Sequence, residues 1–375
     1  GSRINFGIDL GSHSVKIAFA AERGGTVFQQ GVLAADAYTD KYVPNCYWDD
    51  KSRKWFFGSD ADEELTSSSD TVFSVKMLLS ILNEKDESAI NSYKTAQWFP
   101  RSSATITEYM ASLKNRANGI DDGKTFKACF EGNFFTPEKV AQLLFQDMFN
   151  NYVIPALTKL KSARPELPFG NAAETCVLTY PPEASGEYKA EIKRLISVFD
   201  VFEVTQTLSV PKAAGILAFH EKKLDKSVDV LMIDIGESGT SMINISGEGH
   251  KITAQGRQSF LFLGGKDYDR ALSQHVLERE LLRRNSLKSA QTAVQSKLFE
   301  DNIENAKISI SDNSKNTFVE YESDDVRVMF PVSNETFCEI TDEVTTHISN
   351  EIKKELNHPD NQNVDALILS GGATM

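Results

Sequence analysis

The stretch Phe6-Gly7-Ile8-Asp9-Leu10-Gly11-Ser12 is an apolar strand that ends in an Asp-x-Gly turn. The pattern recurs far along the chain as Leu231-Met232-Ile233-Asp234-Ile235-Gly236-Glu237-Ser238-Gly239-Thr240. A second apolar strand follows each copy, at 15–20 and at 241–245. Strand, short turn and strand are typical of a β-hairpin, so the sequence predicts two equivalent hairpins.

Each predicted turn combines a carboxylate with exposed backbone N–H groups. Glycine and other small residues let a backbone approach a phosphate closely, and the N–H groups of a turn can bind an anion. Asp9 and Asp234 could stabilise a phosphate only through a cation such as Mg²⁺, or through its water shell. A single copy would fit an ordinary β-turn. The recurrence favours equivalent turns of two duplicated lobes that face each other across a nucleotide.

Length and composition fit this interpretation. A chain of 375 residues is too long for one ordinary hydrophobic core, and half of it is about the size of one domain. The net charge of −13 argues against broad binding to nucleic acids or anionic membranes. No apolar run reaches the ~18 residues that suggest a membrane span. Four cysteines without a CxxC pair favour a reducing, cytoplasmic compartment, with a cleaved signal peptide as the open alternative.

The remaining pattern predicts lobe I over residues 1–223 and lobe II over residues 224–375. Residues 84–125 are polar and irregular, which indicates an insertion or mobile loop on lobe I. Thr136-Pro137 is a good helix start, with Thr as the N-cap and Pro at the first helical position. The other expected elements are helices at 140–161, 188–199 and 211–223 and strands at 175–180, 203–206 and 366–369.

Several segments between and after the hairpins share one resemblance. They are Thr71-Val72-Phe73-Ser74-Val75-Lys76, Pro211 to Phe219, Leu263-Gly264-Gly265-Lys266-Asp267-Tyr268-Asp269, Glu304 to Ser311, and Leu369 to Thr374. In this order, and with the two hairpins, they resemble the ATPase domain of the heat-shock protein 70 (DnaK-like) chaperones. The resemblance covers roughly residues 4–83 and 130–375. It implies an α/β fold of two actin-like lobes, each a copy of a ribonuclease-H-like unit.

The resemblance also implies a site for ATP or ADP with Mg²⁺. It gives catalytic roles to Lys76, Asp9 and Asp234, and the two aspartates would hold the metal through water. The implied nucleotide contacts are Gly11, Ser12, His13, Gly236, Glu237, Ser238, Gly239, Thr240, Gly264, Gly265, Glu304, Lys307, Ile308, Ser311, Gly371, Gly372 and Ala373.

On the residues alone, plainer interpretations stay open. Lys76 would fit a solvated surface lysine, and His13 would fit a solvated loop histidine. Glu304 and Lys307 share a helix face, so they could bind ribose hydroxyls or form a surface ion pair worth ~0.2–0.5 kcal/mol. Gly371-Gly372 could lie flat against adenine or an α-phosphate, or form an ordinary loop.

Departures from the family pattern bear on catalysis. Val210 stands where family members carry a Glu before the proline, and an ungapped alignment puts Ser241 at the place of an Asp. Gly239 replaces a Thr, Ile308 replaces an adenine-stacking Arg, and Ser12 replaces a Thr. Phosphoryl transfer depends on positioning of metal and water, so nucleotide binding is expected to survive while hydrolysis is weak or absent. This pattern is similar to the large, exchange-factor branch of the family, whose members act on partner chaperones in the stress response.

Two other functions stay open. One is a competent ATPase or small-molecule kinase of this fold, although the connecting segment Ser209-Val210-Pro211 offers no catalytic Asp. The other is a non-catalytic, actin-like scaffold. Family members continue beyond the segment that resembles Leu369 to Thr374, so the resemblance implies that lobe II is incomplete at its C-terminal end. Expected partners are the nucleotide and chaperones or co-chaperones, without nucleic acid or membrane.

Overall fold

The computed structural model describes residues 1–64 and 128–372, apart from isolated positions and short gaps. These are residues 12, 38, 50, 51, 53, 131, 132, 136, 183, 185, 223–226, 249, 250, 262 and 313–316. Three predicted site residues, Ser12, Lys76 and Ala373, lie outside the described residues, as does the predicted insertion at 84–125.

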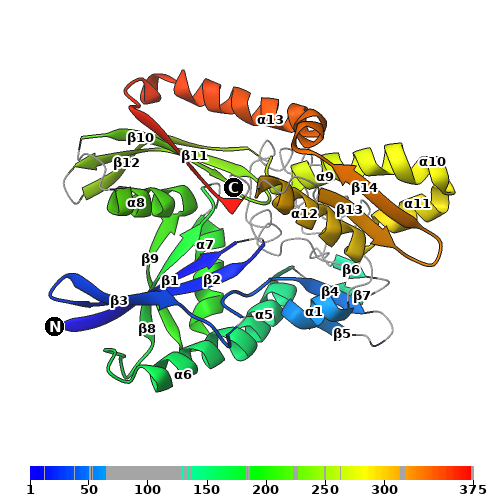
Figure 1. The fold of residues 1–375 in the computed structure, drawn as a ribbon. Coiled ribbons are helices and arrows are strands. Elements are labelled where there is room, and N and C mark those ends of the chain that lie inside the picture. Colours follow the sequence, from blue (N-terminus) through cyan, green and yellow to red (C-terminus); the bar gives the residue numbers. More distant parts are fainter. Residues whose placement is uncertain are drawn as a thin grey trace, which may run out of the picture. The chain divides into compact units, whose positions relative to one another are not determined.

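The chain separates into two compact units (Figure 1). Among the described residues, the first unit holds Gly1–Glu64 and the chain up to Ala213, and the second begins at Ala214. This boundary lies inside helix α8 (Val210–Lys222), whereas the sequence-based boundary after residue 223 falls at the end of the same helix.

The first unit is built on a five-stranded sheet with the order β3-β2-β1-β8-β9. Its strands are β1 (Ser2–Leu10), β2 (Val15–Arg23), β3 (Thr26–Val32), β8 (Glu174–Tyr180) and β9 (Phe202–Ser209). The first three strands are antiparallel neighbours, while β8 is parallel to β1 and β9 is parallel to β8. Alternate residues of β1 are buried, as expected for a strand with one face against a core.

A long helical segment packs on this sheet. It runs through α5 (Pro137–Met148), a π-helical turn (Phe149–Val153) and α6 (Ile154–Ala163), and so covers the helix predicted at 140–161. The ring of Phe149 lies 6.4 Å from that of Phe202 on β9, and Phe202 lies 5.3 Å from Phe6 on β1. The unit also holds α7 (Gly186–Ser197), α1 (Gly58–Glu64), β4 (Cys46–Asp49), β5 (Lys54–Phe57), β6 (Ala128–Phe130) and β7 (Asn133–Phe135).

The second unit repeats the plan of the first. Its sheet has the order β12-β11-β10-β15, with β10 (Asp229–Ile235), β11 (Thr240–Glu248), β12 (Lys251–Leu261) and β15 (Ala366–Ser370). As in the first unit, three antiparallel strands come consecutively, and a later strand pairs in parallel with the first of them. Both predicted hairpins are therefore present, as β1–β2 and β10–β11, and they occupy equivalent places in two related sheets.

Strand β10 is buried on both faces. Val230 and Met232 pack with Ala214 and Phe219 of α8, while Leu231 packs on the other face with α13 (Asn334–Leu356). Figure 1 shows α8 and α13 on opposite sides of this sheet. This double burial explains why the strand is a continuous apolar run without the alternation seen in β1.

A second cluster of helices completes this unit. α9 (Gly265–Val276) and α12 (Lys297–Ser311) pack with the hairpin of β13 (Thr317–Glu322) and β14 (Arg327–Val332) around an apolar core. The side chain of Ser296 accepts the backbone N–H of Phe299 and so caps α12. The remaining elements are η3 (Leu277–Leu281), α10 (Leu282–Arg284), α11 (Leu287–Val294) and η4 (Pro359–Asn361). In the described part of the chain, none of the helices has the length and apolar character needed to cross a membrane.

Candidate functional site

The two hairpin turns have the same backbone geometry. In the first, the N–H of Gly11 donates to the carbonyl of Ser14 at 3.0 Å. In the second, the N–H of Gly236 donates to the carbonyl of Gly239 at 2.9 Å. The last paired residues are Leu10 and Val15 in the first hairpin and Ile235 and Thr240 in the second. A loop of four residues therefore closes each hairpin. His13 lies exposed in the first of these loops.

Both aspartates accept a hydrogen bond from a hydroxyl on the neighbouring parallel strand. Thr179 Oγ1 donates to Asp9 Oδ1 at 2.6 Å, and Ser370 Oγ donates to Asp234 Oδ1 at 2.9 Å. Each hydroxyl lies near the carboxyl end of its strand, β8 or β15, where ligands bind in many α/β sheets. The two contacts are equivalent under the duplication, and they fix each carboxylate beside its turn.

The antiparallel neighbours of the two aspartates differ. Asp9 lies opposite Lys16 on β2, and Asp234 lies opposite Ser241 on β11. Residues directly opposite in an antiparallel pair point to the same face of the sheet. The side chain of Ser241, the position at which the sequence resemblance predicts an Asp in other family members, is therefore beside Asp234 and is buried.

The start of α9 holds the second turn in place. The N–H of Gly265 donates to the carbonyl of Gly236 at 2.8 Å, and the N–H of Lys266 donates to the carbonyl of Glu237 at 2.9 Å. A Cβ atom on Gly264 would lie 2.4 Å from the Gly236 carbonyl oxygen, so only glycine fits there. The hydroxyl of Thr240, the first residue of β11, donates to the carbonyl of Leu263 at 2.7 Å. This bond links the segment before α9 to β11.

The loop after β15 also lies against the second turn. Gly371 has a φ of 95°, which side-chain-bearing residues rarely adopt, and a Cβ there would lie 2.2 Å from the carbonyl oxygen of Ile235. The close approach brings the predicted Gly371-Gly372 segment to the end of β10, next to Asp234.

Helix α12 carries the residues predicted to contact ribose, and one of them has a further role. Lys307 Nζ lies 2.7 Å from Asp269 Oδ1 and donates to the Gly265 carbonyl at 3.3 Å, so it links α12 to α9. Burial raises the pKa of Asp269 to about 6, and the nearby Lys307 and Lys266 oppose that rise. Ile308, where the resemblance predicts a stacking Arg in other family members, is 49% exposed, and Ser311 donates to the Lys307 carbonyl.

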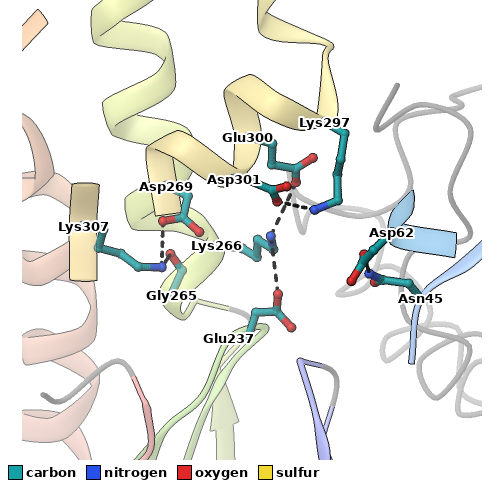
Figure 2. A network of polar contacts seen from close by, with 10 residues as sticks. All are labelled: Asn45, Asp62, Glu237, Gly265, Lys266, Asp269, Lys297, Glu300, Asp301 and Lys307. Carbon is teal, nitrogen blue, oxygen red and sulfur yellow. Dashed lines mark hydrogen bonds and ion pairs between the residues drawn. The ribbon is translucent and has the colours of Figure 1, made fainter. Parts of the chain in front are cut away.

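A second lysine joins α12 to the turn itself. Figure 2 shows Lys266 between Glu237 of the turn and Glu300 of α12. Sequence reasoning assigned no role to Lys266, Glu300, Thr179 or Ser370. Little in the sequence singled out these four residues, because a lysine next to glycines, a glutamate on a helix and hydroxyl residues at strand ends are common in proteins without any role in binding.

The predicted site residues thus fall into two described groups. The first unit brings together Asp9, Gly11 and His13, and the second brings the turn 236–240 together with Gly264, Gly265 and Gly371. Among the described residues, no group of three or more His, Cys, Asp or Glu side chains is placed to hold a metal directly. Single carboxylates beside N–H-rich turns fit Mg²⁺, which usually keeps several waters and is bound by one or two carboxylates together with phosphates.

The duplicated sheets and their matched Asp-x-Gly turns define an α/β domain of the two-lobed, actin-like type. Comparison with protein families agrees, because the model described as "Hsp70 protein" matches residues 5–375. The chain belongs to the Hsp70 family, and the resemblance of its motifs to that family is confirmed.

Proposed function

We propose that this chain binds ATP and ADP together with Mg²⁺, as the nucleotide-binding domain of an Hsp70-type chaperone, and that it hydrolyses ATP slowly or not at all. The observation that carries the proposal is the matched pair of turns, each with an aspartate fixed by a hydroxyl from the next strand. Equivalent geometry at two places far apart in the sequence argues for the same kind of ligand at each turn rather than for two unrelated loops.

Binding draws on three parts of the second unit and on the first turn. The turn 236–239 offers backbone N–H groups to phosphate oxygens, and Asp234 would hold a water of the Mg²⁺ shell. Glu304 on α12 would accept a hydrogen bond from ribose. Gly371, without a side chain and at positive φ, leaves room for the adenosine to approach the end of β10. Asp9 and Gly11 repeat the phosphate contacts in the first unit.

Weak hydrolysis is expected because two carboxylates of the family pattern are replaced. A carboxylate that holds a metal-bound water provides directed electrostatic stabilisation, and one such contact can be worth ~3 kcal/mol of barrier, or about a hundredfold in rate. Ser241 offers a hydroxyl beside Asp234 where the family pattern carries a carboxylate. Val210, the first residue of α8, replaces a second one. A domain of this kind would act through its nucleotide-dependent conformation on partner chaperones, as the exchange-factor branch does.

The test separates binding from turnover. Calorimetry would measure ATP and ADP affinity with and without Mg²⁺ for the wild type, Asp9→Ala and Asp234→Ala. Both variants are expected to lose the Mg²⁺-dependent part of ATP binding. Unchanged Mg-ATP affinity in Asp234→Ala would show that the second turn is not a phosphate site.

Single-turnover hydrolysis of bound ATP would then compare the wild type with the double variant Val210→Glu, Ser241→Asp. The double variant is expected to be faster. Rapid turnover by the wild type would refute weak hydrolysis and favour a competent ATPase.

A further inference from the structure

One lysine occupies the junction between the second turn and α12. Lys266 Nζ lies 3.4 Å from Glu237 Oε1 and 3.4 Å from Glu300 Oε1 (Figure 2). The three side chains are only 14%, 15% and 18% exposed, so water screens their charges less than it would at the surface. This cluster is therefore part of the packed structure and not a mobile surface pair.

Lys266 holds Glu237 by its main chain as well as by its side chain. Its N–H donates to the Glu237 carbonyl at 2.9 Å, while its ammonium group reaches the Glu237 carboxylate. Glu237 lies in the middle of the candidate phosphate turn, directly after Gly236. Lys266 therefore holds the middle of that turn at two points, while the N–H of Gly265 holds Gly236.

Lys266 is positively charged at neutral pH. Burial alone would lower the pKa of its ammonium group, but the carboxylates of Glu237, Glu300, Asp269 and Glu304 outweigh burial and raise the pKa. The lysine therefore stays protonated throughout the neutral range. It is the cation that offsets the Glu237 carboxylate in the turn.

A second lysine makes a parallel link. Lys307 of α12 contacts Asp269 and the Gly265 carbonyl, both on α9. Glu300, Glu304 and Lys307 are spaced by four and three residues, so they lie on one face of α12. The helix that carries the candidate ribose contact Glu304 is thereby joined at two points to the helix that holds the phosphate turn.

The consequence for binding is electrostatic. A phosphate at the turn would meet the negative charge of Glu237, and like charges in a poorly screened site repel strongly. We propose that Lys266 is a positioning residue that neutralises Glu237, so that the second turn can accept the phosphates of a nucleotide, and that it couples the turn to α12 through Glu300. This inference rests on the nucleotide binding proposed above.

The experiment compares two ligands, Mg-ADP and adenosine, by calorimetry. Lys266→Met keeps the apolar stem but removes the charge. It is expected to weaken Mg-ADP binding at least tenfold, about 1.4 kcal/mol, and adenosine binding less than threefold, because adenosine carries no phosphate. Adding Glu237→Gln to Lys266→Met removes the negative charge that is no longer neutralised, and it is expected to bring Mg-ADP affinity back to within about threefold of the wild type.

Lys297→Met is the matched control, because Lys297 is also a lysine in an ion pair, but it lies at the start of α12 and pairs with Asp301 of the same helix. It is expected to change neither affinity. Thermal unfolding without ligand checks that each variant is folded. If Lys266→Met does not fold, Glu237→Gln alone decides, since removal of a negative charge from the turn is expected to tighten Mg-ADP binding.

Several results would overturn the inference. These are a Lys266→Met variant with Mg-ADP affinity within twofold of the wild type, an equal loss of adenosine and ADP binding, the absence of rescue by Glu237→Gln, or weaker ADP binding in Glu237→Gln alone. A wild type that binds no nucleotide would refute the proposed function itself, and that outcome is distinct from a loss confined to Lys266→Met.

Discussion

Substitution of Ser241 by Asp places a second carboxylate beside Asp234. The two residues are directly opposite in the β10–β11 pair, and such residues have Cβ atoms roughly 5 Å apart. At that separation, with an effective dielectric constant of about 20, two negative charges repel by about 3 kcal/mol. Ser241 is buried, so solvent relieves little of this repulsion.

We therefore expect Ser241→Asp to destabilise the ligand-free protein by about 3 kcal/mol at pH 7, in the presence of a chelator. Each kcal/mol corresponds to roughly 2–4 °C for a unit of this size, so the midpoint of thermal unfolding should fall by roughly 6–12 °C. Added Mg²⁺ should recover most of the loss, because a cation between the two carboxylates turns repulsion into attraction. Differential scanning calorimetry with and without Mg²⁺ measures both effects.

The matched control is Ser241→Asn, which has the same shape without the charge and should not respond to Mg²⁺. Without Mg²⁺, Ser241→Asp should have a lower free energy of unfolding than Ser241→Asn, and this difference should become smaller as the pH falls from 7 to 5. Repulsion raises the folded-state pKa of one carboxyl, so the folded protein takes up a proton before the unfolded chain does. Equal stability of the two variants at pH 7 without Mg²⁺ would refute the reasoning about this position.

Three further outcomes are expected. Glu304→Ala should weaken ATP and ADP binding by equal factors in calorimetry, because ribose is common to both; a loss confined to ATP would contradict the ribose assignment. Thr179→Val and Ser370→Ala each remove one hydrogen bond to an aspartate, worth about 1 kcal/mol. Each should therefore weaken Mg-ATP binding about fivefold. Unchanged affinity in both variants would show that the hydroxyls do not position the carboxylates. Gly264→Ala should lower the free energy of unfolding by about 1–3 kcal/mol in urea, because its Cβ has no room, whereas Gly186→Ala, with nothing within 4 Å, is the control that should not.

The sequence was sufficient for the hairpins because their signal is local. An apolar strand, an Asp-x-Gly turn and a second strand specify β1–β2 and β10–β11 without information from elsewhere in the chain. The continuous apolar run of β10 likewise reflects its burial between α8 and α13. The duplication could be predicted because the same local signal occurred twice.

The contacts that complete the site could not be predicted in the same way. Thr179 reaches Asp9 only because β8 is parallel to β1 in one particular register, and a shift of one residue would turn the hydroxyl to the other face. Lys307 illustrates the same limit. Helical spacing suggested a pairing with Glu304, while the packing of α12 on α9 brings the lysine to Asp269. Long-range register and helix packing are properties of the whole unit, and single-sequence patterns do not contain them.

The double burial of β10 has a consequence for amide hydrogen exchange. A strand in the interior of its sheet and covered on both faces belongs to the part of a domain that opens last, so the amides of Leu231 and Ile233 should exchange only by unfolding of the whole unit. Asp234 lies near the carboxyl end of this strand. A ligand anchored there would be attached to the slowest-opening part of the unit, and its release would depend on movement of the surrounding turn and of α12, not on fraying of the strand that carries the carboxylate.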